Sequence, residues 1–295
     1  MSDVNASVSL MDAEHHYASP RTRETLSVVI ICQDEERNIR RCLESIKWAD
    51  EIVIVDSGST DRTLDIASEY TDRIFHQPWL GFGPQKNFAI SKATCDWVLY
   101  MEADEWATPE FKEEMMQMLA SGTHCNAFLV PYRHVYRGHW VKHAGLYPRY
   151  IARLFRRGKG KFRQALRHAR PEVTPPVGRF KTDIAHDYGD SIWQYIVRCN
   201  NHTWMEAVQA WESGERATVI KMLLAPMWKF VWRYVFKLGF LDGVPGLLLC
   251  AAKAFNIFLR YAMLWELERG GWRERPPSYQ SVHIGERMMG KRNTV

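Results

Sequence analysis

The sequence predicts an α/β protein in which a mostly parallel β-sheet is flanked by helices and followed by a helical region. Short β-favouring apolar runs at residues 26–31, 51–55 and 97–101 alternate with segments whose apolar residues recur at helical spacing. Each run is followed by an acidic turn, as expected where parallel strands end beside a ligand crevice. With 295 residues, 46% of them hydrophobic, the chain is long enough for one α/β domain and an appendage.

The central run is EIVIV (residues 51–55), which reads as a buried parallel strand and leads into the turn DSGSTD (residues 56–61). Ser59 or Thr60 is predicted to cap a helix over residues 60–70. Asp56 and Asp61 would flank a ligand pocket at the strand's carboxyl end. Asp56 can accept hydrogen bonds from a base or a ribose. The alternative is that Asp56 only forms the turn.

The first strand, residues 26–31, precedes a helix with Ile39, Leu43 and Ile46 at helical spacing. Between them lies the acidic segment QDEE (residues 33–36). Acids in the first turn of a helix interact favourably with its dipole, which accounts for Glu36. Asp34 and Glu35 are expected to line a nucleotide pocket as well.

A short strand is predicted near residues 73–76, followed by a Gly- and Pro-containing loop and a helix near residues 85–93. Lys86 would stand at this loop–helix junction, where a cation and the helix start can meet a phosphate. The alternative is an ordinary solvated lysine.

The strand at residues 97–101 runs directly into EADE (residues 102–105). Successive strand side chains alternate faces, so these carboxylates converge only if the chain turns there. A turn would let one carboxylate bind Mg²⁺ or Mn²⁺ while another binds a hydroxyl. The alternative is a solvated acidic cluster. Thr108 and Pro109 then begin a helix as N-cap and first residue. Its predicted inward-facing residues are Phe111, Met115 and Leu119.

Charge and cysteine content narrow the class of protein. The net charge is +5, and residues 149–181 are rich in Lys and Arg with a single acid, Glu172. This suits a phosphorylated ligand or an anionic surface, or is a solvated basic face. The six cysteines form no CxxC pair, which favours a reduced cytosolic chain. Residues 1–24 lack a basic-then-apolar leader and are expected to form a flexible tail.

Four motifs in order resemble the family 2 glycosyltransferases with the GT-A fold. They are VVIICQDEE (residues 28–36), VDSGSTD (55–61), GPQKN (83–87) and WVLYMEADE (97–105). Further segments are similar to the bacterial lipopolysaccharide core β-1,4-glucosyltransferase subfamily: WADEI (48–52), RLFRR (153–157) and KLGFLDG (237–243). The resemblance covers roughly residues 26–265.

The resemblance implies a UDP-sugar site. In it, Asp56 would read the nucleobase, Lys86 would lie by the nucleotide and Glu102 would hold the ribose. Asp104 would bind the Mg²⁺ or Mn²⁺ cofactor, and His186 could complete the metal shell, although a histidine is more often simply packed. The implied nucleotide-sugar-binding residues are Cys32, Asp34, Glu35, Asp56, Ser57, Lys86, Asn87, Glu102, Ala103 and Asp104.

Two positions depart from the family pattern. Glu102 stands where the family usually has Asp, a change of one methylene that should be tolerated. More seriously, an inverting transferase needs a general base within reach of the acceptor hydroxyl. The subfamily often has His-Glu where this chain has His168-Ala169. Glu172 is therefore predicted as the catalytic base, with Asp183 and Asp187 as alternatives.

Residues 221–267 become apolar, aromatic and basic. Charges at Asp242, Lys253 and Arg260 interrupt the segment, so we expect no uncharged run near the ~20 residues of a bilayer span. Tryptophan mixed with Lys and Arg suits helices lying in the interface of an anionic leaflet. The alternatives are a helical subdomain packed on the core or a dimer contact. Residues 271–295 read as a polar tail.

These features predict a GT-A domain over residues 25–190 and a helical, membrane-interface region over residues 191–270. The expected activity is inverting transfer of a hexose, glucose from UDP-glucose, onto a lipid-linked saccharide at the cytoplasmic face of the membrane. A polyprenyl-phosphate sugar transferase and a catalytically silent membrane scaffold are the alternatives. The acidic first loop disfavours a nucleotidyltransferase, the absence of GxGxxG disfavours a dehydrogenase, and no nucleic acid partner is expected.

Overall fold

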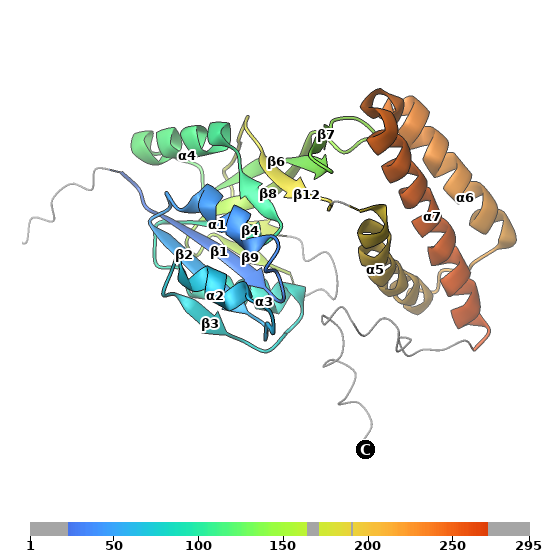
Figure 1. The fold of residues 1–295 in the computed structure, drawn as a ribbon, viewed down its shortest axis with the longest axis horizontal. Coiled ribbons are helices and arrows are strands. Elements are labelled where there is room, and N and C mark those ends of the chain that lie inside the picture. The colour runs from blue at the N-terminus through green and yellow to red at the C-terminus, as the bar shows by residue number, and fades with distance from the viewer. Residues whose placement is uncertain (1–22, 164–170, 190, 271–295) are drawn as a thin grey trace, which may run out of the picture.

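The computed structural model describes residues 23–163, 171–189 and 191–270 of the chain. Within these ranges, ten strands form one mixed sheet and two more form a small ribbon (Figure 1). The strands are β1 (Leu26–Cys32), β2 (Glu51–Asp56), β3 (Ile74–His76), β4 (Trp97–Glu102), β5 (Glu105–Ala107), β6 (Ala127–Tyr136), β7 (His139–Val141), β8 (Arg149–Arg156), β9 (Gly160–Phe162), β10 (Pro171–Val173), β11 (Val177–Arg179) and β12 (Ile184–Asp187). The helices are α1 (Ile39–Ile46), α2 (Thr63–Ser68), α3 (Phe82–Ser91), α4 (Pro109–Ser121), α5 (Ile192–Glu212), α6 (Val219–Val231) and α7 (Gly243–Glu268), with a π-helix η1 (Trp232–Phe236) and a 3₁₀ helix η2 (Gly239–Asp242).

The sheet has a parallel half and a mixed half. Its order is β3-β2-β1-β4-β8-β6-β12-β5, with β3, β2, β1 and β4 all parallel. The carboxyl ends of these four strands therefore meet at one edge, where ligands bind in open α/β sheets. β8 runs antiparallel to β4 and joins β6, and β6 pairs in parallel with β12.

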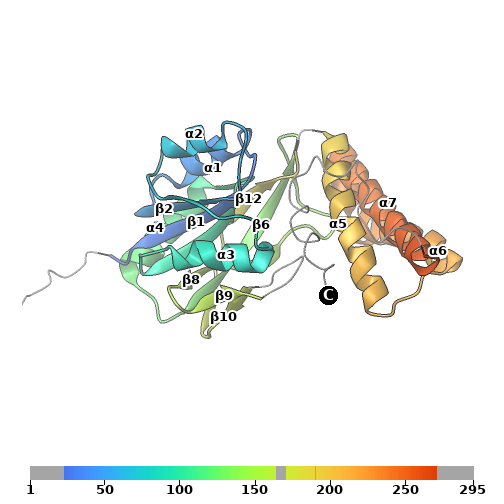
Figure 2. The same cartoon turned by 90° about the horizontal axis from the view of Figure 1, so that it is seen from below.

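Helices cover both faces of the parallel half (Figure 2). α1, α2 and α4 pack on one face, where the apolar side chains predicted to face inward are buried. They are Ile39, Leu43, Ile46, Phe111, Met115 and Leu119. α3 packs on the other face. The predicted start of α4 is confirmed, because the Thr108 side chain accepts a hydrogen bond from the Phe111 N–H and Pro109 is the first helical residue.

Two predicted helix starts are wrong. α2 begins after Arg62 and has no side-chain cap. Ser59 and Thr60 do not cap it, because their hydroxyls donate to Asp56 and Asp34 instead. α3 begins at Phe82, because Gly81 adopts a left-handed φ of 97° there and Pro84 is tolerated in a first helical turn. Lys86 therefore lies in the second turn of α3 rather than at a loop–helix junction.

The helical region follows β12 and lies beside the sheet on the side of β7 (Figure 1). The loop after β7 joins the two parts. Asp242 accepts hydrogen bonds from the backbone N–H groups of Lys142 and His143, at 3.1 and 2.8 Å. An apolar cluster that includes Val141, Ala144 and Leu249 packs around this contact.

One helical stretch in the described part of the chain, Gly239–Glu268, is long and apolar enough to cross a bilayer by length and composition, with a mean hydropathy of 1.5. The expectation that no uncharged run approaches this length holds, because Lys253 and Arg260 interrupt the stretch, but it did not anticipate one continuous helix. A single helix continues through isolated charges such as Lys253 and Arg260, so counting uncharged residues underestimated it.

The expected tails, residues 1–24 and 271–295, lie outside the described residues except for Arg23 and Glu24. Glu24 is not part of a loose tail, since its carboxylate accepts hydrogen bonds from Arg156 and from the Trp97 indole.

Candidate functional site

Hydrogen bonds connect the loop that follows β1 to the loop that follows β2. The Asp34 N–H donates to the Ser59 hydroxyl at 2.9 Å, and the Asp34 carboxylate accepts from the Thr60 N–H at 2.7 Å. The Glu35 N–H donates to the Thr63 hydroxyl. Asp34 has a left-handed φ of 54°, which Asp adopts more readily than most residues. These acids therefore hold the two loops together, and their contact with a nucleotide stays a prediction.

Asp56 forms the turn at the end of β2. Its side chain is 2% exposed and accepts hydrogen bonds from the Gly58 and Ser59 N–H groups, at 2.8 and 3.1 Å. Gly58 has a φ of 104°, which favours glycine. The turn-forming alternative is thus observed, and the nucleobase role of Asp56 stays a prediction.

Cys32 and Ser57 lie beside this turn. The Ser57 N–H donates to the Cys32 carbonyl, and the Ser57 hydroxyl accepts from the Gln85 amide. Burial, followed by the charges of Asp56 and Glu35, raises the pKa of the Cys32 thiol far above its usual range. Cys32 therefore stays protonated and does not act as a thiolate.

The sheet register brings the two predicted acidic ends to one edge. Cys32 in β1 pairs with Asp56 in β2, and Ile31 pairs with Glu102 in β4. Since neighbouring strands are about 4.8 Å apart, β1 separates the backbones of Asp56 and Glu102 by roughly 10 Å. The carboxyl ends of β2 and β4 therefore lie at the same edge of the sheet, and a nucleotide shared by Asp56 and Asp104 stays a prediction.

A three-residue cluster occupies the end of β4. One ligand atom each from Glu102, Asp104 and His186 lies within 4.8 Å of the others. The chain turns at Ala103 and Asp104, which lets the carboxylates converge as predicted. β12 supplies His186, because His186 pairs with Glu105 across the β12–β5 ladder. Its Nε2 lies 3.3 Å from Asp104 Oδ2.

Two buried cations face these carboxylates. Lys86 is 8% exposed, and its Nζ lies 3.1 Å from Glu102 and 4.5 Å from the centre of the Tyr100 ring. Arg153 is 6% exposed and donates to Glu105 at 2.8 Å. Lys86 therefore lies beside the acidic motif with Glu102 as its partner, and its contact with a nucleotide stays a prediction.

The charged groups in the cluster shift one another's pKa values. Burial opposes ionisation of Glu102, but Lys86 and Arg153 outweigh it and hold the pKa of that carboxyl well below its usual range. Burial raises the pKa of Glu105 and the Arg153 guanidinium opposes that rise, with a net shift upward. Burial lowers the pKa of His186, but the Asp104 carboxylate reverses this and raises it to about 9. His186 is therefore a cation at neutral pH.

His134 supports His186 from β6. The two imidazole Nδ1 atoms are 3.4 Å apart, and the His134 ring stacks on Tyr188 at 4.6 Å between centroids. Burial, with a contribution from the His186 charge, lowers the pKa of His134 to about 3. His134 is therefore neutral and fixes the orientation of the neighbouring ring.

The donor set fits a divalent cation. Carboxylate oxygens are the ligands that Mg²⁺ and Mn²⁺ prefer, and imidazole is compatible with Mn²⁺. The turn at Ala103 and the β12–β5 pairing already converge the three ligands, so the residues present suit the expected cofactor.

Two other residues predicted for the site, Asn87 and Glu172, bind other parts of the protein. Asn87 ties α3 to β9 through paired hydrogen bonds with the Phe162 backbone. Glu172 lies on β10 and is bound by Arg163 and Lys161. The hydrogen bond from Arg163 lowers the pKa of Glu172, which weakens it as a base. The positions His168-Ala169 lie outside the described residues.

The two alternative bases are paired as well. Asp183 is 3% exposed and forms an ion pair with Arg133. Asp187 forms an ion pair with Arg41 at 2.6 Å.

Sequence reasoning missed the roles of Arg153, Tyr132 and His134. Arg153 belongs to the RLFRR motif, and an arginine inside the apolar strand run IARLF (residues 151–155) is a signal for a buried ion pair. Tyr132 donates to Glu105 at 2.7 Å, and no sequence signal identifies it.

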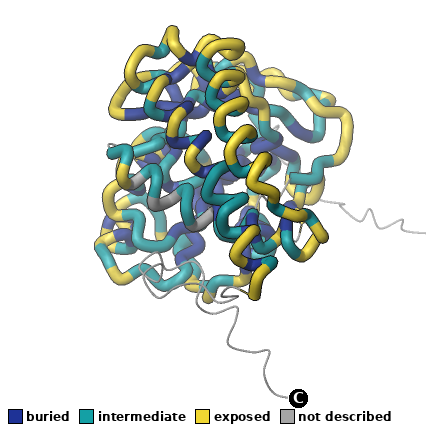
Figure 3. Tube along the Cα trace, turned by 90° about the vertical axis from the view of Figure 1, so that its right-hand side faces the viewer, coloured by how far each residue is buried: buried dark blue, intermediate teal, exposed yellow. Residues whose placement is uncertain are grey.

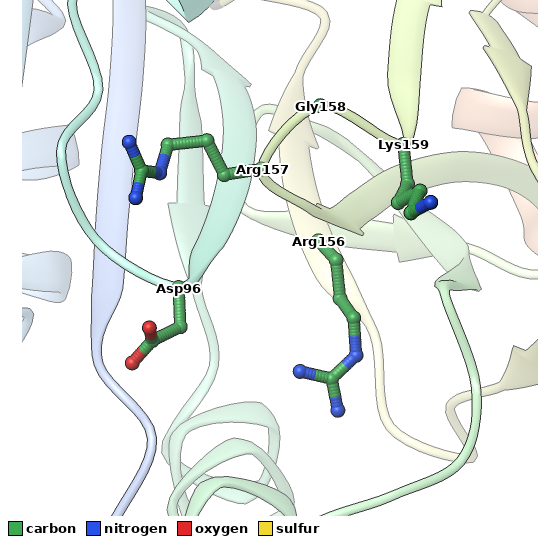
Figure 4. Close-up of a pocket in the computed structure, with 5 residues that line it drawn as sticks. All are labelled: Asp96, Arg156, Arg157, Gly158 and Lys159. Carbon is green, nitrogen blue, oxygen red and sulfur yellow. The ribbon is translucent and has the colours of Figure 1, made fainter.

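A hollow at the opposite end of β4 was also missed. Asp96, Arg156, Arg157 and Lys159 surround a space of about 470 Å³ (Figure 4). It lies where β4 begins and β8 ends, away from the carboxylate cluster. Asp96 is already engaged by the Thr25 N–H and hydroxyl.

A half-parallel sheet with an acidic cluster and buried cations at its carboxyl edge is the arrangement expected of a glycosyltransferase with the GT-A fold. Residues 27–174 match the family model described as glycosyl transferase family 2. The chain belongs to this family.

Among relatives, the chain is 30% identical over 254 residues to the lipopolysaccharide core biosynthesis glycosyltransferase LpsC of Rhizobium meliloti, covering 81% of this chain and 93% of that protein. It is 28% identical to the glycosyltransferase RT0209 of Rickettsia typhi, covering 82% and 87%. Among solved structures, it is similar to S. aureus TarS 1-349 in complex with UDP-GlcNAc, at 15% identity and a TM-score of 0.44, covering 85% and 93%. Glucosyl-3-phosphoglycerate synthase from Mycobacterium tuberculosis with Mg²⁺ and UDP matches at 26% identity and a TM-score of 0.31, covering 39% and 44%.

Proposed function

We propose that this glycosyltransferase is an inverting, metal-dependent hexosyltransferase that moves a sugar, glucose from UDP-glucose, onto a lipid-linked saccharide. The observation that carries the proposal is the cluster of Glu102, Asp104 and His186 beside the buried Lys86. Converging carboxylates can hold a metal, and a fixed cation next to them can hold a diphosphate.

The donor half of the proposal uses the carboxyl edge of β2, β1 and β4. Asp56 reads the nucleobase and Glu102 the ribose. Cys32, Asp34, Glu35, Ser57, Asn87 and Ala103 complete the site. Lys86 is held by ring contacts and one ion pair. It can therefore bind a diphosphate with little reorganisation, which is the condition for strong electrostatic stabilisation.

Asp104 and His186, with Glu102 nearby, would hold Mg²⁺ or Mn²⁺. When bound, the ion supplies Lewis-acid stabilisation of negative charge on the diphosphate. His186 must lose its proton to become a ligand, and His134 keeps its ring in place for that change.

The acceptor half includes the general base. The acceptor hydroxyl attacks the anomeric carbon, the bond to the nucleoside diphosphate breaks, and the hydroxyl proton passes to Glu172. Arg163 and Lys161 contact this carboxylate, so an acceptor that draws these cations away would restore its basicity. The name of LpsC supports a lipopolysaccharide core saccharide as the acceptor.

We further propose that the chain associates peripherally with the inner face of the cytoplasmic membrane. α6 has no buried residue, and Figure 3 shows exposed stretches on the side of the molecule where the helical region lies. Large apolar residues of α6, η1, η2 and the start of α7 are exposed and are called here the apolar helix face. Its large apolar residues include Val219, Ile220, Leu223, Leu224, Met227, Trp228, Trp232, Val235, Phe236, Leu238, Phe240, Leu241 and Val244.

The charges of this face complement an anionic leaflet. Lys221, Lys229, Arg233 and Lys237 lie among the apolar residues, and Asp242 is the only acid between residues 216 and 265. The Asp242 side chain is 6% exposed because it binds the loop after β7. Apolar side chains among uncompensated cations are typical of helices that lie in a membrane interface. Residues 191–270 would then bind the membrane interface and hold the GT-A domain, residues 25–190, at its surface.

A screen of nucleotide-sugars with Mn²⁺ or Mg²⁺ tests the function, with membrane glycolipid as acceptor and nucleoside diphosphate release as the signal. We expect UDP-glucose to be the donor and Asp104→Asn to abolish UDP release in a folded protein. The exposed Asp65→Asn is the matched control. Normal turnover by Asp104→Asn would eliminate the metal assignment. Mass measurement of the product would separate this activity from transfer to polyprenyl phosphate, and absence of any transfer or donor hydrolysis would favour a silent scaffold.

A further inference from the structure

A cleft of about 430 Å³ opens on the far side of β12 from His186. Arg41, Trp106, Arg133, Trp140 and Asp187 are among the residues that line it. Asp187 directly follows His186 in β12, and successive strand side chains point to opposite faces. Trp106 and Arg133 both pair with Ala185 across neighbouring ladders, so they lie on the same face as Asp187.

An arginine guanidinium group lies over the ring of each tryptophan in the cleft. The Arg41 guanidinium lies 4.1 Å from the centre of the Trp106 ring, and that of Arg133 lies 4.2 Å from the Trp140 ring. Lys142 adds an ammonium 4.4 Å from Trp140. Stacking fixes the plane of a guanidinium and directs its N–H donors outward, which suits a carboxylate or a phosphate.

The balance of charge favours an anion. Asp187 binds Arg41, and Asp183 binds Arg133. Lys142 leaves a positive charge in excess of these two pairs. The ion pair with Asp187 uses one Arg41 N–H, while a guanidinium has five. The Trp140 indole N–H is buried and has no hydrogen-bond partner among the described residues. A polar ligand that reached it would satisfy that donor.

The cleft lies near both the carboxylate cluster and the apolar helix face. At one end, the Asp187 N–H donates to the carbonyl of Asp104 at 3.0 Å, so the cleft adjoins the carboxylate cluster. At the other end, the Lys142 N–H donates to Asp242, which anchors the apolar helix face. The cleft therefore lies between that face and the cluster.

We propose that this cleft binds an anionic sugar unit of the acceptor saccharide. Trp106 and Trp140, with the guanidinium groups over their rings, would bind the sugar ring and its carboxylate or phosphate. The reacting end of the saccharide would reach the carboxylate cluster. The inference rests on the proposed function for its choice of a saccharide, and it adds the acceptor's chemical class and the residues that select it. Specificity then resides in Arg41, Trp106, Trp140 and Lys142, which the donor site does not use.

Ligand-observed NMR titration of the full-length chain tests the proposal without requiring turnover. The probes are glucose 6-phosphate, glucuronate, glucose and inorganic phosphate, with UDP and Mg²⁺ present to occupy the donor site. The variants are Arg41→Gln, Trp106→Ala and Lys142→Gln. Arg40→Gln is the matched control, because the adjacent Arg40 pairs with Glu69 outside the cleft. Lys92→Gln controls for Lys142, since Lys92 also lies over aromatic rings.

We expect both anionic sugars to bind more tightly than glucose or phosphate. Affinity should fall at least fivefold in Arg41→Gln and Trp106→Ala and less in Lys142→Gln, and it should be unchanged in both controls. Equal binding of glucose would overturn the anionic class, and equal binding of inorganic phosphate would reduce the cleft to a simple anion site. Unchanged binding by folded Arg41→Gln and Trp106→Ala would overturn the assignment. UDP affinity, measured in parallel, reports on the proposed function separately.

Discussion

The Nε2 atom of His186 lies 3.3 Å from Oδ2 of Asp104, joining the end of β12 to the turn after β4. The two residues are 82 positions apart in the sequence. Their contact makes His186 a cation that occupies the place where a metal ion would compete for the same two side chains. Proton and metal binding are therefore linked at this site.

Metal affinity should depend on pH. The pKa of His186 is raised to about 9, so below that pH the metal must displace a proton. We expect the apparent affinity for Mn²⁺, followed by the electron paramagnetic resonance signal of the free ion, to rise about tenfold per pH unit between pH 6 and 8.5. His186→Gln should bind more weakly with a flatter profile. A wild-type affinity that does not change over this range would argue against His186 as a ligand.

Glu172→Gln should separate chemistry from donor binding. If Glu172 takes the acceptor proton, its loss should slow transfer by on the order of 10²–10⁴ and leave UDP affinity unchanged. Rapid-quench measurement of product, with calorimetry for UDP, gives both quantities. Exposed Glu113→Gln on α4 is the control. Transfer at the wild-type rate would show that another group is the base.

Replacing Arg153 should destabilise the fold. Arg153→Met leaves Glu105, which is 1% exposed, buried without its charge partner. The free energy of unfolding, from urea denaturation, should fall by about 3–5 kcal/mol. Arg40→Met breaks the exposed pair with Glu69 and should cost far less, because water screens an exposed ion pair. Adding Glu105→Gln to Arg153→Met should recover part of the loss, and equal losses in the two single variants would contradict a buried pair.

His134 should make the fold sensitive to acid. Its pKa is lowered from 6.5 to about 3, so between these values the unfolded chain binds a proton that the folded chain does not. Stability should therefore fall with falling pH, by about 1.4 kcal/mol per pH unit from this group. His134→Phe, which can still stack on Tyr188, should show a smaller slope between pH 6.5 and 4.5. The same slope in both proteins would mean that His134 is not buried as a neutral ring.

Vesicle flotation should reveal binding through the apolar helix face. We expect the chain to float with vesicles containing anionic phosphatidylglycerol, less with phosphatidylcholine alone, and less at high salt. Trp228→Glu with Trp232→Glu should reduce flotation at least tenfold. Leu80→Glu, on a residue 46% exposed outside this face, should have no effect. Resistance of the membrane-bound chain to alkaline carbonate would instead indicate that Gly239–Glu268 spans the bilayer.

Much of the catalytic half could be predicted from local pattern. β1, β2 and β4 lie where β-favouring runs were read, and Thr108 and Pro109 begin α4 as expected. These features depend on neighbours in sequence, because strand burial and helix capping are set by residues a few positions apart. The predicted start of α2 failed because Thr60 bonds to Asp34 in another loop. The predicted start of α3 failed because Gly81 has a left-handed φ there.

By itself, the sequence determined the alternation of strands and helices as far as α4, the family, and the acids at the ends of β1, β2 and β4, since periodicity and motif spacing are properties of the chain alone. Only the tertiary structure decided which of those acids face a cation, a histidine or their own turn. Lys86 with Glu102, Arg153 with Glu105 and His186 with Asp104 are pairs whose partners come from different elements. Ion pairing and desolvation act through space, so the state of each site residue is fixed only when the sheet brings those elements together.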